Sequence, residues 1–251
     1  MKTHATRNTQ HATHPTSRAF TLIELLVVIG LIALLAAMSI PVMAAVKRAQ
    51  AIARAQAELK QVETAIEFYQ HKLGYYPPDN PPPSFPWTTN NLLPNQLYYE
   101  LLGTTNVGTA AAPVYMTLDG SARIKASDLA TFFGPNVTGF MNCAQAGRAT
   151  DEAPNAVAFL QKGLKASQFM SITNGSSTAA MSVLGTGVVG PLVYQNTLGV
   201  KLNPWRYNSS GPQHNPKSFD LWVDITVGNY TYRISNWSDR PIIVTAPFAY
   251  P

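Results

Sequence analysis

One apolar segment near the N-terminus constrains this chain more than any other feature. The run from Phe20 to Ile40 contains 21 residues, and its only charged member is Glu24. At about 1.5 Å per residue, a helix of this length crosses the hydrocarbon core of a bilayer. The sequence therefore predicts a transmembrane helix over residues 20–43.

Glu24 is poorly placed for a residue inside such a helix. A carboxylate near the centre of a membrane helix costs a few kcal/mol unless a partner neutralises it. If the chain is cut between Ala19 and Phe20, the new α-amino group lies four residues from Glu24. The ammonium of one subunit and the carboxylate of its neighbour then attract each other strongly when the helices pack side by side. Glu24 is thus the candidate for an assembly salt bridge.

These residues resemble the class III signal of type IV pilins and type II secretion pseudopilins. The match consists of Ala19, the run Phe20-Thr21-Leu22-Ile23-Glu24-Leu25, and the long apolar helix that follows. The resemblance implies that a prepilin peptidase cuts between Ala19 and Phe20 and methylates the new amine of Phe20. Residues 1–19 are then a leader peptide, and Glu24 is the fifth mature residue. The family usually has Gly before the cut, but Ala19 is also small, so we expect processing.

Pro41 falls at the twenty-second mature position, where the family commonly has a proline. A proline inside a helix removes one backbone hydrogen bond and usually bends the axis. We therefore expect a helix kink at Pro41.

The alternative is an ordinary secretory signal or a signal anchor. An ordinary signal has a shorter apolar core, of about 7–15 residues, and is cut after that core at a small-residue site. Ala36-Ala37 and Ala44-Ala45 imitate such a site. The acidic residue at the start of the core and the helical pattern beyond it argue against this alternative.

Composition and charge fit one membrane helix and one globular domain. The chain has 251 residues, of which 46% are hydrophobic. Three of its 18 basic residues (Lys2, Arg7 and Arg18) precede the apolar run, which leaves 15 basic residues against 13 acidic ones. A basic leader stays in the cytoplasm. The expected location is therefore the bacterial inner membrane, as a single-pass protein with its C-terminal domain in the periplasm. The single cysteine, Cys143, excludes an internal disulfide.

Residues 44–74 read as the amphipathic half of the same helix. Apolar residues recur there at intervals of three and four, which predicts one buried stripe. Gly74 is placed to end the helix, and Tyr75-Tyr76-Pro77-Pro78 follows it, a pattern that resembles the segment after the long helix in the major pseudopilins. The stripe consists of Ile52, Ala55, Leu59, Val62, Ile66, Tyr69 and Leu73.

Residues 75–200 are predicted to form a loop-rich insertion. Short helices are expected at 97–102, at 127–133 and at 155–164. The second of these has Ser127 as a candidate cap and Pro135 as a candidate stop.

The last segment, 201–251, is predicted to form an antiparallel sheet. Alternation in Phe219, Leu221, Val223 and Ile225 gives it one apolar face. Its pattern resembles the C-terminal region of the major pseudopilins, which have a Pro-Trp element, a His-Asn turn, a Phe-Asp-Leu strand and a closing Asn-Trp. The family binds calcium in the loop before the closing element. Here that loop, 224–233, has one carboxylate and an added arginine, so we expect no cofactor and no metal ligand.

No enzyme motif stands out in the chain. The sequence contains no phosphate loop, no Gly-x-Ser-x-Gly elbow and no His-Glu-x-x-His motif. Asp220 and Asp224 share a strand face but are well separated, which favours turn or surface roles over catalysis. We therefore expect no catalytic residues.

The expected fold class is α+β. The resemblance implies a pilin-like fold in which the long N-terminal helix packs on a small C-terminal antiparallel sheet, with a long loop-rich insertion. The implied function is that of a pseudopilin in a type II secretion pseudopilus. The implied partners are the prepilin peptidase, other subunits, an inner-membrane assembly platform and the bilayer, without nucleic acid. Two alternatives stay open: a type IV pilin for adhesion, motility or DNA uptake, and a membrane-anchored periplasmic binding domain that does not polymerise.

Overall fold

The structure is a computed structural model of the whole chain. It divides into two compact units, Met1–Val46 and Lys47–Pro251, which are treated separately below. It describes residues 20–79, 95–134, 137–144, 155–160, 164–173, 180–191 and 203–245, without the side chains of 38–42.

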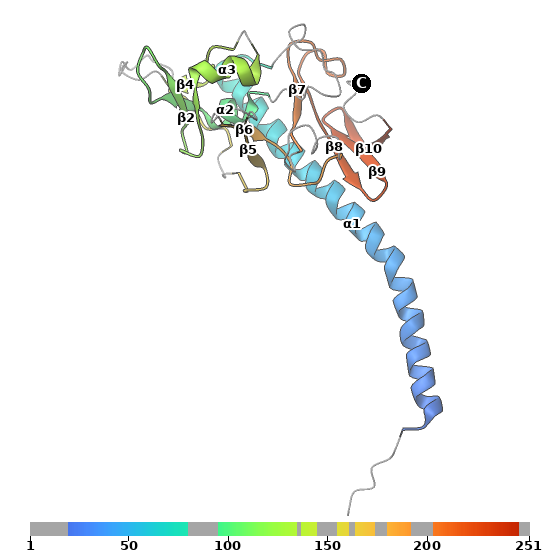
Figure 1. Cartoon of the computed structure of the whole chain (residues 1–251). Coiled ribbons are helices and arrows are strands. Elements are labelled where there is room, and N and C mark those ends of the chain that lie inside the picture. The colour runs from blue at the N-terminus through green and yellow to red at the C-terminus, as the bar shows by residue number, and fades with distance from the viewer. Residues whose placement is uncertain are drawn as a thin grey trace, which may run out of the picture. The chain divides into compact units, whose positions relative to one another are not determined.

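The first helix, α1 (Leu22–Leu73), runs through the end of the first unit and into the second (Figure 1). Its helical backbone continues through Pro41, and the expected bend there stays a prediction. Within the described residues, no helix combines the length and the apolar character that a membrane crossing requires. The transmembrane segment at 20–43 therefore also stays a prediction.

The predicted end of α1 is confirmed. The helix stops at Leu73, and the amide of Gly74 donates to the carbonyl of Gln70 at 2.7 Å. Gly74 has a φ of +87°, in the left-handed region where a residue without a Cβ pays little steric cost. The local sequence around Gly74 thus determines where the helix ends.

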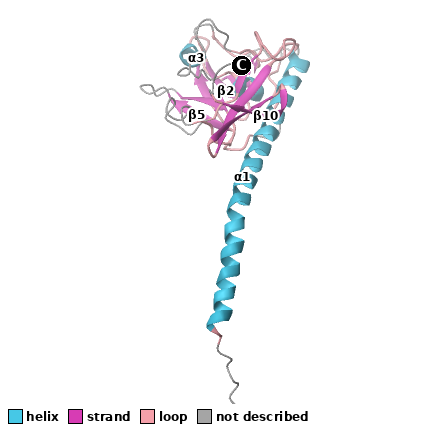
Figure 2. Cartoon of the chain, turned by 90° about the vertical axis from the view of Figure 1, so that its right-hand side faces the viewer, coloured by secondary structure: helices cyan, strands magenta, loops and turns pink. Residues whose placement is uncertain are grey.

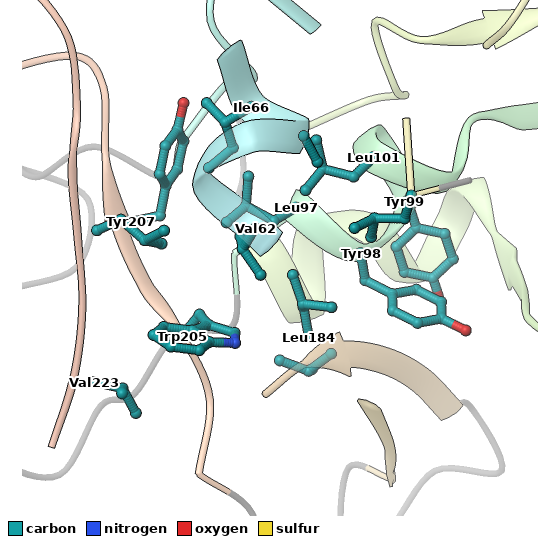
Figure 3. Packing of buried hydrophobic residues seen from close by; sticks show 14 of the residues in the cluster. Val62, Ile66, Leu97, Tyr98, Tyr99, Leu101, Leu184, Trp205, Tyr207 and Val223 are labelled. Atoms are coloured by element: carbon teal, nitrogen blue, oxygen red, sulfur yellow. The ribbon is translucent and has the colours of Figure 1, made fainter. Parts of the chain in front are cut away.

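The predicted apolar stripe of α1 is also confirmed in the second unit. Five of its members are buried, and Ile52 and Leu73 pack against the core from partly buried positions. The stripe meets side chains from α2 and from the C-terminal sheet (Figure 3). The five buried members are Ala55, Leu59, Val62, Ile66 and Tyr69.

The C-terminal sheet has the strand order β10-β9-β8-β7, and every neighbouring pair is antiparallel. Its strands are β7 (Arg206–Asn208), β8 (Asp220–Val227), β9 (Tyr230–Ser235) and β10 (Ser238–Val244).

The predicted loop at 224–233 is wrong. Strands β8 and β9 stay paired up to Val227 and Tyr230, so only Gly228 and Asn229 form the turn. Gly228 has a φ of +62°, as two-residue hairpin turns require. The hairpin places Asp224 directly opposite Arg233.

Both faces of β8 are buried. Phe219, Leu221, Val223 and Ile225 are all 0% exposed, which confirms the predicted apolar face. Asp220 and Asp224, on the opposite face, are also 0% exposed, so of the turn or surface roles expected for them the surface role is wrong. Buried carboxylates require partners, and each of these two has them, as described below.

The described residues between α1 and this sheet form two smaller sheets and two short helices. The helices are α2 (Leu97–Leu102) and α3 (Ala126–Phe133). A four-stranded sheet has the order β3-β2-β1-β4, in which only the β1–β4 pair is parallel. Its strands are β1 (Thr104–Asn106), β2 (Val114–Thr117), β3 (Arg123–Lys125) and β4 (Cys143–Ala144). A separate hairpin joins β5 (Phe169–Thr173) to β6 (Ala180–Leu184).

The three helices expected in this region have different outcomes. The helix at 97–102 is confirmed. The second begins at Ala126 with Lys125 at the cap position and no side-chain cap, so the capping role predicted for Ser127 is wrong, because Ser127 lies inside the helix. Pro135 lies outside the described residues. The third is wrong over 155–160, and 161–163 lie outside the described residues. The amides of Phe159 and Leu160 both donate to the carbonyl of Leu101, which ties this segment to the end of α2.

One hydrophobic core joins these parts in the second unit. It combines the α1 stripe with aromatic residues of α2 and of the C-terminal strands, such as Tyr98, Trp205 and Tyr207 (Figure 3). Figure 2 shows the strands gathered beside the last turns of α1. The architecture is α+β: a helix packed with small antiparallel sheets, in the manner of a pilin-like fold with loop insertions.

Candidate functional site

The candidate site is the N-terminus of α1, where Thr21 and Glu24 bind each other. The Glu24 Oε2 atom accepts hydrogen bonds from the Thr21 amide at 2.9 Å and from the Thr21 hydroxyl at 2.8 Å. The Thr21 Oγ1 atom in turn accepts from the Glu24 amide at 3.3 Å. This reciprocal arrangement is a capping box, which satisfies helix amides that have no partner in the first turn.

The capping box fixes the Glu24 carboxylate against the first turn of its own helix. The first turn of a helix carries partial positive charge, which favours a carboxylate there. Both bonds from Thr21 go to Oε2, and Glu24 is exposed. A carboxylate held this way is oriented before any second subunit arrives.

Sequence reasoning missed the role of Thr21. Its signal was present, because a Thr followed three residues later by Glu at the start of an apolar helix is the capping-box pattern.

The apolar side chains around this site contact little within their own unit. Phe20 is 81% exposed, and the described side chains up to Ala37 are exposed on all sides of the helix. A helix that is hydrophobic all round is stable only where other apolar groups surround it. This surface therefore needs lipid or neighbouring helices.

The other predicted site residues are only partly placed by the structure. Ala19 lies outside the described residues, so the Ala19–Phe20 bond and the methylation of Phe20 stay predictions. The pairing of Glu24 with an amine requires a second chain and is likewise untested. The described part of the chain holds no group of three or more side chains suited to a metal ion.

Asp224, the only carboxylate of the segment 224–233, is bound by Arg233. Arg233 Nε lies 2.8 Å from Asp224 Oδ1, and Arg233 Nη2 lies 3.1 Å from Asp224 Oδ2. Both side chains are buried, with 0% and 5% exposed. Because the guanidinium binds both carboxylate oxygens, it competes with any cation for Asp224. The expectation that no metal binds here stays a prediction.

Asp220 organises the preceding turn. Its carboxylate accepts hydrogen bonds from the amides of Gln213, His214 and Asn215 at 2.8 to 3.0 Å. The His214 ring stacks on Trp237 with a centroid distance of 4.1 Å. The His-Asn and Asn-Trp elements noted in the sequence thus meet around one buried carboxylate.

Glu58 is a third buried carboxylate, and sequence periodicity did not reveal it. Its Oε2 accepts from the Thr186 hydroxyl at 2.6 Å and from the Gly187 amide at 3.1 Å, and its Oε1 pairs with Arg54 Nε at 2.9 Å. Thr186 and Gly187 belong to a Gly-x-Gly-x-x-Gly segment, 185–190, which follows strand β6. These contacts hold the segment against α1, and a Cβ at Gly187 would collide with Nη2 of Arg54.

Glu100, in α2, is completely buried. It accepts hydrogen bonds from the Tyr69 hydroxyl at 2.9 Å and from the amides of Met141 and Asn142 at 2.8 and 2.9 Å. Burial raises the pKa of Glu100, and the three hydrogen bonds oppose that rise only in part. The folded chain therefore holds a proton on Glu100 at a higher pH than the unfolded chain does.

This difference in pKa predicts how stability depends on pH. Between the unfolded pKa and the raised folded pKa, only the folded state binds the proton. The Glu100 contribution to the free energy of unfolding is therefore greatest at low pH and is lost as pH rises through the folded pKa. The loss is about 1.4 kcal/mol for each unit of difference between the two pKa values.

Unfolding of the full chain in detergent by urea at several pH values between 5 and 8 measures this effect. Glu100→Gln should remove that component of the pH dependence, whereas Glu67→Gln, at an exposed position of α1, should retain it. Equal pH dependence in the wild type and in Glu100→Gln would contradict the prediction.

Comparison with known families bears directly on the N-terminal site. The family model described as the prokaryotic N-terminal methylation motif matches residues 15–40, which include Thr21 and Glu24. The chain carries a type IV pilin-like prepilin signal. The comparisons with curated proteins and with solved structures found no match.

The prepilin signal supports a coarse functional class. Proteins with this motif are pilin-like or pseudopilin subunits, which are structural components rather than enzymes. The signal implies processing by a prepilin peptidase, anchoring in a membrane with the globular part facing the periplasm, and assembly with other pilin subunits.

Proposed function

We propose that this chain is a pseudopilin of a type II secretion pseudopilus. The observation that carries the proposal is the prepilin signal with the Glu24 carboxylate held at the exposed N-terminus of an apolar helix. The C-terminal pattern from Pro204-Trp205 to Asn236-Trp237 favours secretion over a retractable pilus. In this role the protein performs no chemistry and uses no cofactor. Addition of subunits at the base of a filament pushes cargo outward.

Assembly in this proposal is driven by a change of partner at Glu24. Cleavage between Ala19 and Phe20 leaves a methylated amine on Phe20 that is still positively charged. The amine of one subunit replaces Thr21 as the partner of Glu24 in the next, because an ion pair in an apolar setting is stronger than two hydrogen bonds from a neutral hydroxyl and amide. The apolar surface of residues 20–37 is buried between neighbouring helices at the same time.

Before assembly, residues 20–43 anchor the subunit in the inner membrane. Lys47 and Arg48 follow this segment after three further residues and are exposed. Basic side chains at such a place bury their alkyl stems in the interface and keep their charges in water. The assembly platform then takes up the anchored subunit and adds it to the filament.

Processing at Ala19 tests the proposal. A leucine at this position is expected to reduce cleavage at least tenfold, because the site requires a small residue before the cut. Ala19→Gly is the matched control and should be processed at the wild-type rate or faster. Mass spectrometry of the purified protein should find N-methyl-Phe20 at the N-terminus in the wild type and in the control. A mature chain that begins at Met1, or beyond Ile40, would contradict the proposal.

A type IV pilin for adhesion, motility or DNA uptake is the second candidate. The observation that favours it is the additional ordered sheet β3-β2-β1-β4, which gives the globular part a surface that a compact secretion subunit does not need. Deletion of the chain separates the two roles: loss of exported proteins indicates secretion, and loss of twitching or DNA uptake indicates a pilus. A third candidate, an anchored periplasmic domain that does not polymerise, predicts neither loss nor any filament.

A further inference from the structure

A groove of about 640 Å³ lies beside the C-terminal half of α1, within the second unit. Thr64 and Phe68 of α1 form one wall, and Phe159 and Leu160 form the other. Phe68 is 62% exposed. It lies outside the apolar stripe of α1, whose members are buried or partly buried. Covering the groove would remove this apolar surface from water, which is favourable.

The rim of the groove is basic. Lys60 and Lys165 line it. Lys60 Nζ lies 3.0 Å from Glu63 Oε2, whereas Lys165 is exposed and has no ion pair with any described residue. A partner for this groove should therefore present apolar side chains next to an acidic group.

Strand β10 has these properties. It forms one edge of the C-terminal sheet, with β9 as its neighbour. Ile242 and Ile243 are adjacent on it and are 42% and 58% exposed. Asp239, on the same strand, is exposed and makes no ion pair within the described part of the chain. Pro241 lacks an amide hydrogen, which disfavours hydrogen-bonded pairing of β10 with a further strand. A partner would therefore contact β10 through its side chains.

The groove and β10 occupy different places on the second unit. Strand β10 approaches α1 at Gln56, whose Nε2 donates to the Asp239 carbonyl at 3.2 Å. Figure 1 shows the β7–β10 sheet on one side of α1 and the β5–β6 hairpin on the other. The groove-lining residues Phe159 and Leu160 precede this hairpin in the chain. Gln56 does not line the groove, so strand β10 meets α1 outside it.

We propose that the groove receives the exposed β10 side chains Ile243 and Asp239 of a second copy of this chain. The two patches differ, so the contact is heterologous: each subunit offers a groove to one neighbour and a strand to another. Such a contact leads to an open helical array rather than a closed dimer. Asp239 of the inserted strand lies near the basic rim, and Ile243 covers Phe68. The proposal rests on the proposed function, because it names the contact through which the globular parts of a filament bind.

Mutation of Phe68 is the first test, in cells that carry the assembly machinery. Phe68→Ser is expected to reduce the assembled fraction about tenfold, as truncation of a central interface aromatic commonly does. Its melting temperature should stay at the wild-type value, because Phe68 is largely exposed. Val107→Ser is the matched control, since Val107 is 47% exposed and lies far along the chain from the groove. Unchanged assembly of Phe68→Ser would overturn the proposal.

Cross-linking tests the pairing itself. In a Cys143→Ser background, a chain with both Thr64→Cys and Ile243→Cys should give a ladder of dimers, trimers and larger products with a short thiol-reactive cross-linker. Each single variant should give no product alone, and a mixture of the two single variants should give dimers only. Replacing Thr64→Cys by Ala53→Cys, at an exposed position of α1 outside the groove, should abolish the ladder.

The outcomes separate this contact from the proposed function. Filaments that require Glu24 but give no ladder overturn the β10–groove contact and leave the pseudopilin proposal intact. Dimers from Thr64→Cys alone show groove-to-groove contact and overturn the proposal, as does cross-linking of the groove to a different protein. Absence of any filament overturns both.

Discussion

Replacing Glu24 by alanine is expected to abolish filament assembly while membrane insertion and cleavage continue. The substitution leaves the methylated amine of Phe20 without a counter-charge between packed helices, and removal of one partner from a buried charge pair costs roughly 2–5 kcal/mol. Since 1.4 kcal/mol is a tenfold change, each subunit contact should weaken by more than tenfold. The loss of the capping box, about 1 kcal/mol, affects the monomer only slightly.

Shearing assembled filaments from cells and comparing them with the membrane fraction measures this effect. Glu67→Ala is the matched control, because Glu67 is an exposed glutamate on the same helix. The control should assemble normally. Wild-type amounts of filament from Glu24→Ala would rule out the salt bridge as the driving contact.

Replacing Arg233 by methionine is expected to be the most destabilising single change in the globular part. Asp224 is 0% exposed and Arg233 is 5% exposed, so the substitution strips a buried carboxylate of its guanidinium. Breaking a buried pair in this way typically costs about 3–5 kcal/mol. That is a large part of the total stability of an ordinary domain, roughly 5–15 kcal/mol.

Urea unfolding of the full chain in detergent measures the loss. The double variant Asp224→Leu/Arg233→Met should recover most of it, because replacing both partners by apolar groups leaves no buried charge. Lys60→Met breaks the exposed pair with Glu63 and should cost less than about 1 kcal/mol. If Arg233→Met and Lys60→Met proved equally mild, the Asp224–Arg233 pair would not hold the hairpin. Rescue of Arg233→Met by added calcium, but not by sodium at equal ionic strength, would show that the arginine substitutes for a metal.

Much of the candidate site was predictable from the sequence because its chemistry is local. The apolar run, the position of Glu24 and the Ala19–Phe20 bond all lie within a few residues of one another. The capping role of Thr21 depends on its spacing to Glu24 in the same stretch, so it too is a local feature of the sequence. By contrast, the groove beside Phe68 is lined by residues about a hundred positions apart in the chain, such as Phe68 and Leu160. Periodicity along α1 predicts only that Phe68 lies outside the buried stripe.

The buried carboxylates mark the limit of sequence reasoning in the fold. Glu58 binds Thr186, 128 residues away, and Glu100 binds Met141, 41 residues away. The burial of Asp224 was not predictable either. Its partner Arg233 comes opposite it only because a two-residue turn sets the register of the two strands.

The sequence by itself determined the prepilin signal, the helix with its apolar stripe and its end at Gly74, and the apolar face of β8. Each of these depends on side-chain spacing along one element, which the chain order sets directly. Only the tertiary structure decided which polar groups are buried, with which partners, and which apolar side chains stay exposed on α1 and β10. Those outcomes depend on which distant segments pack together, because burial makes a charge costly unless a second segment supplies its partner.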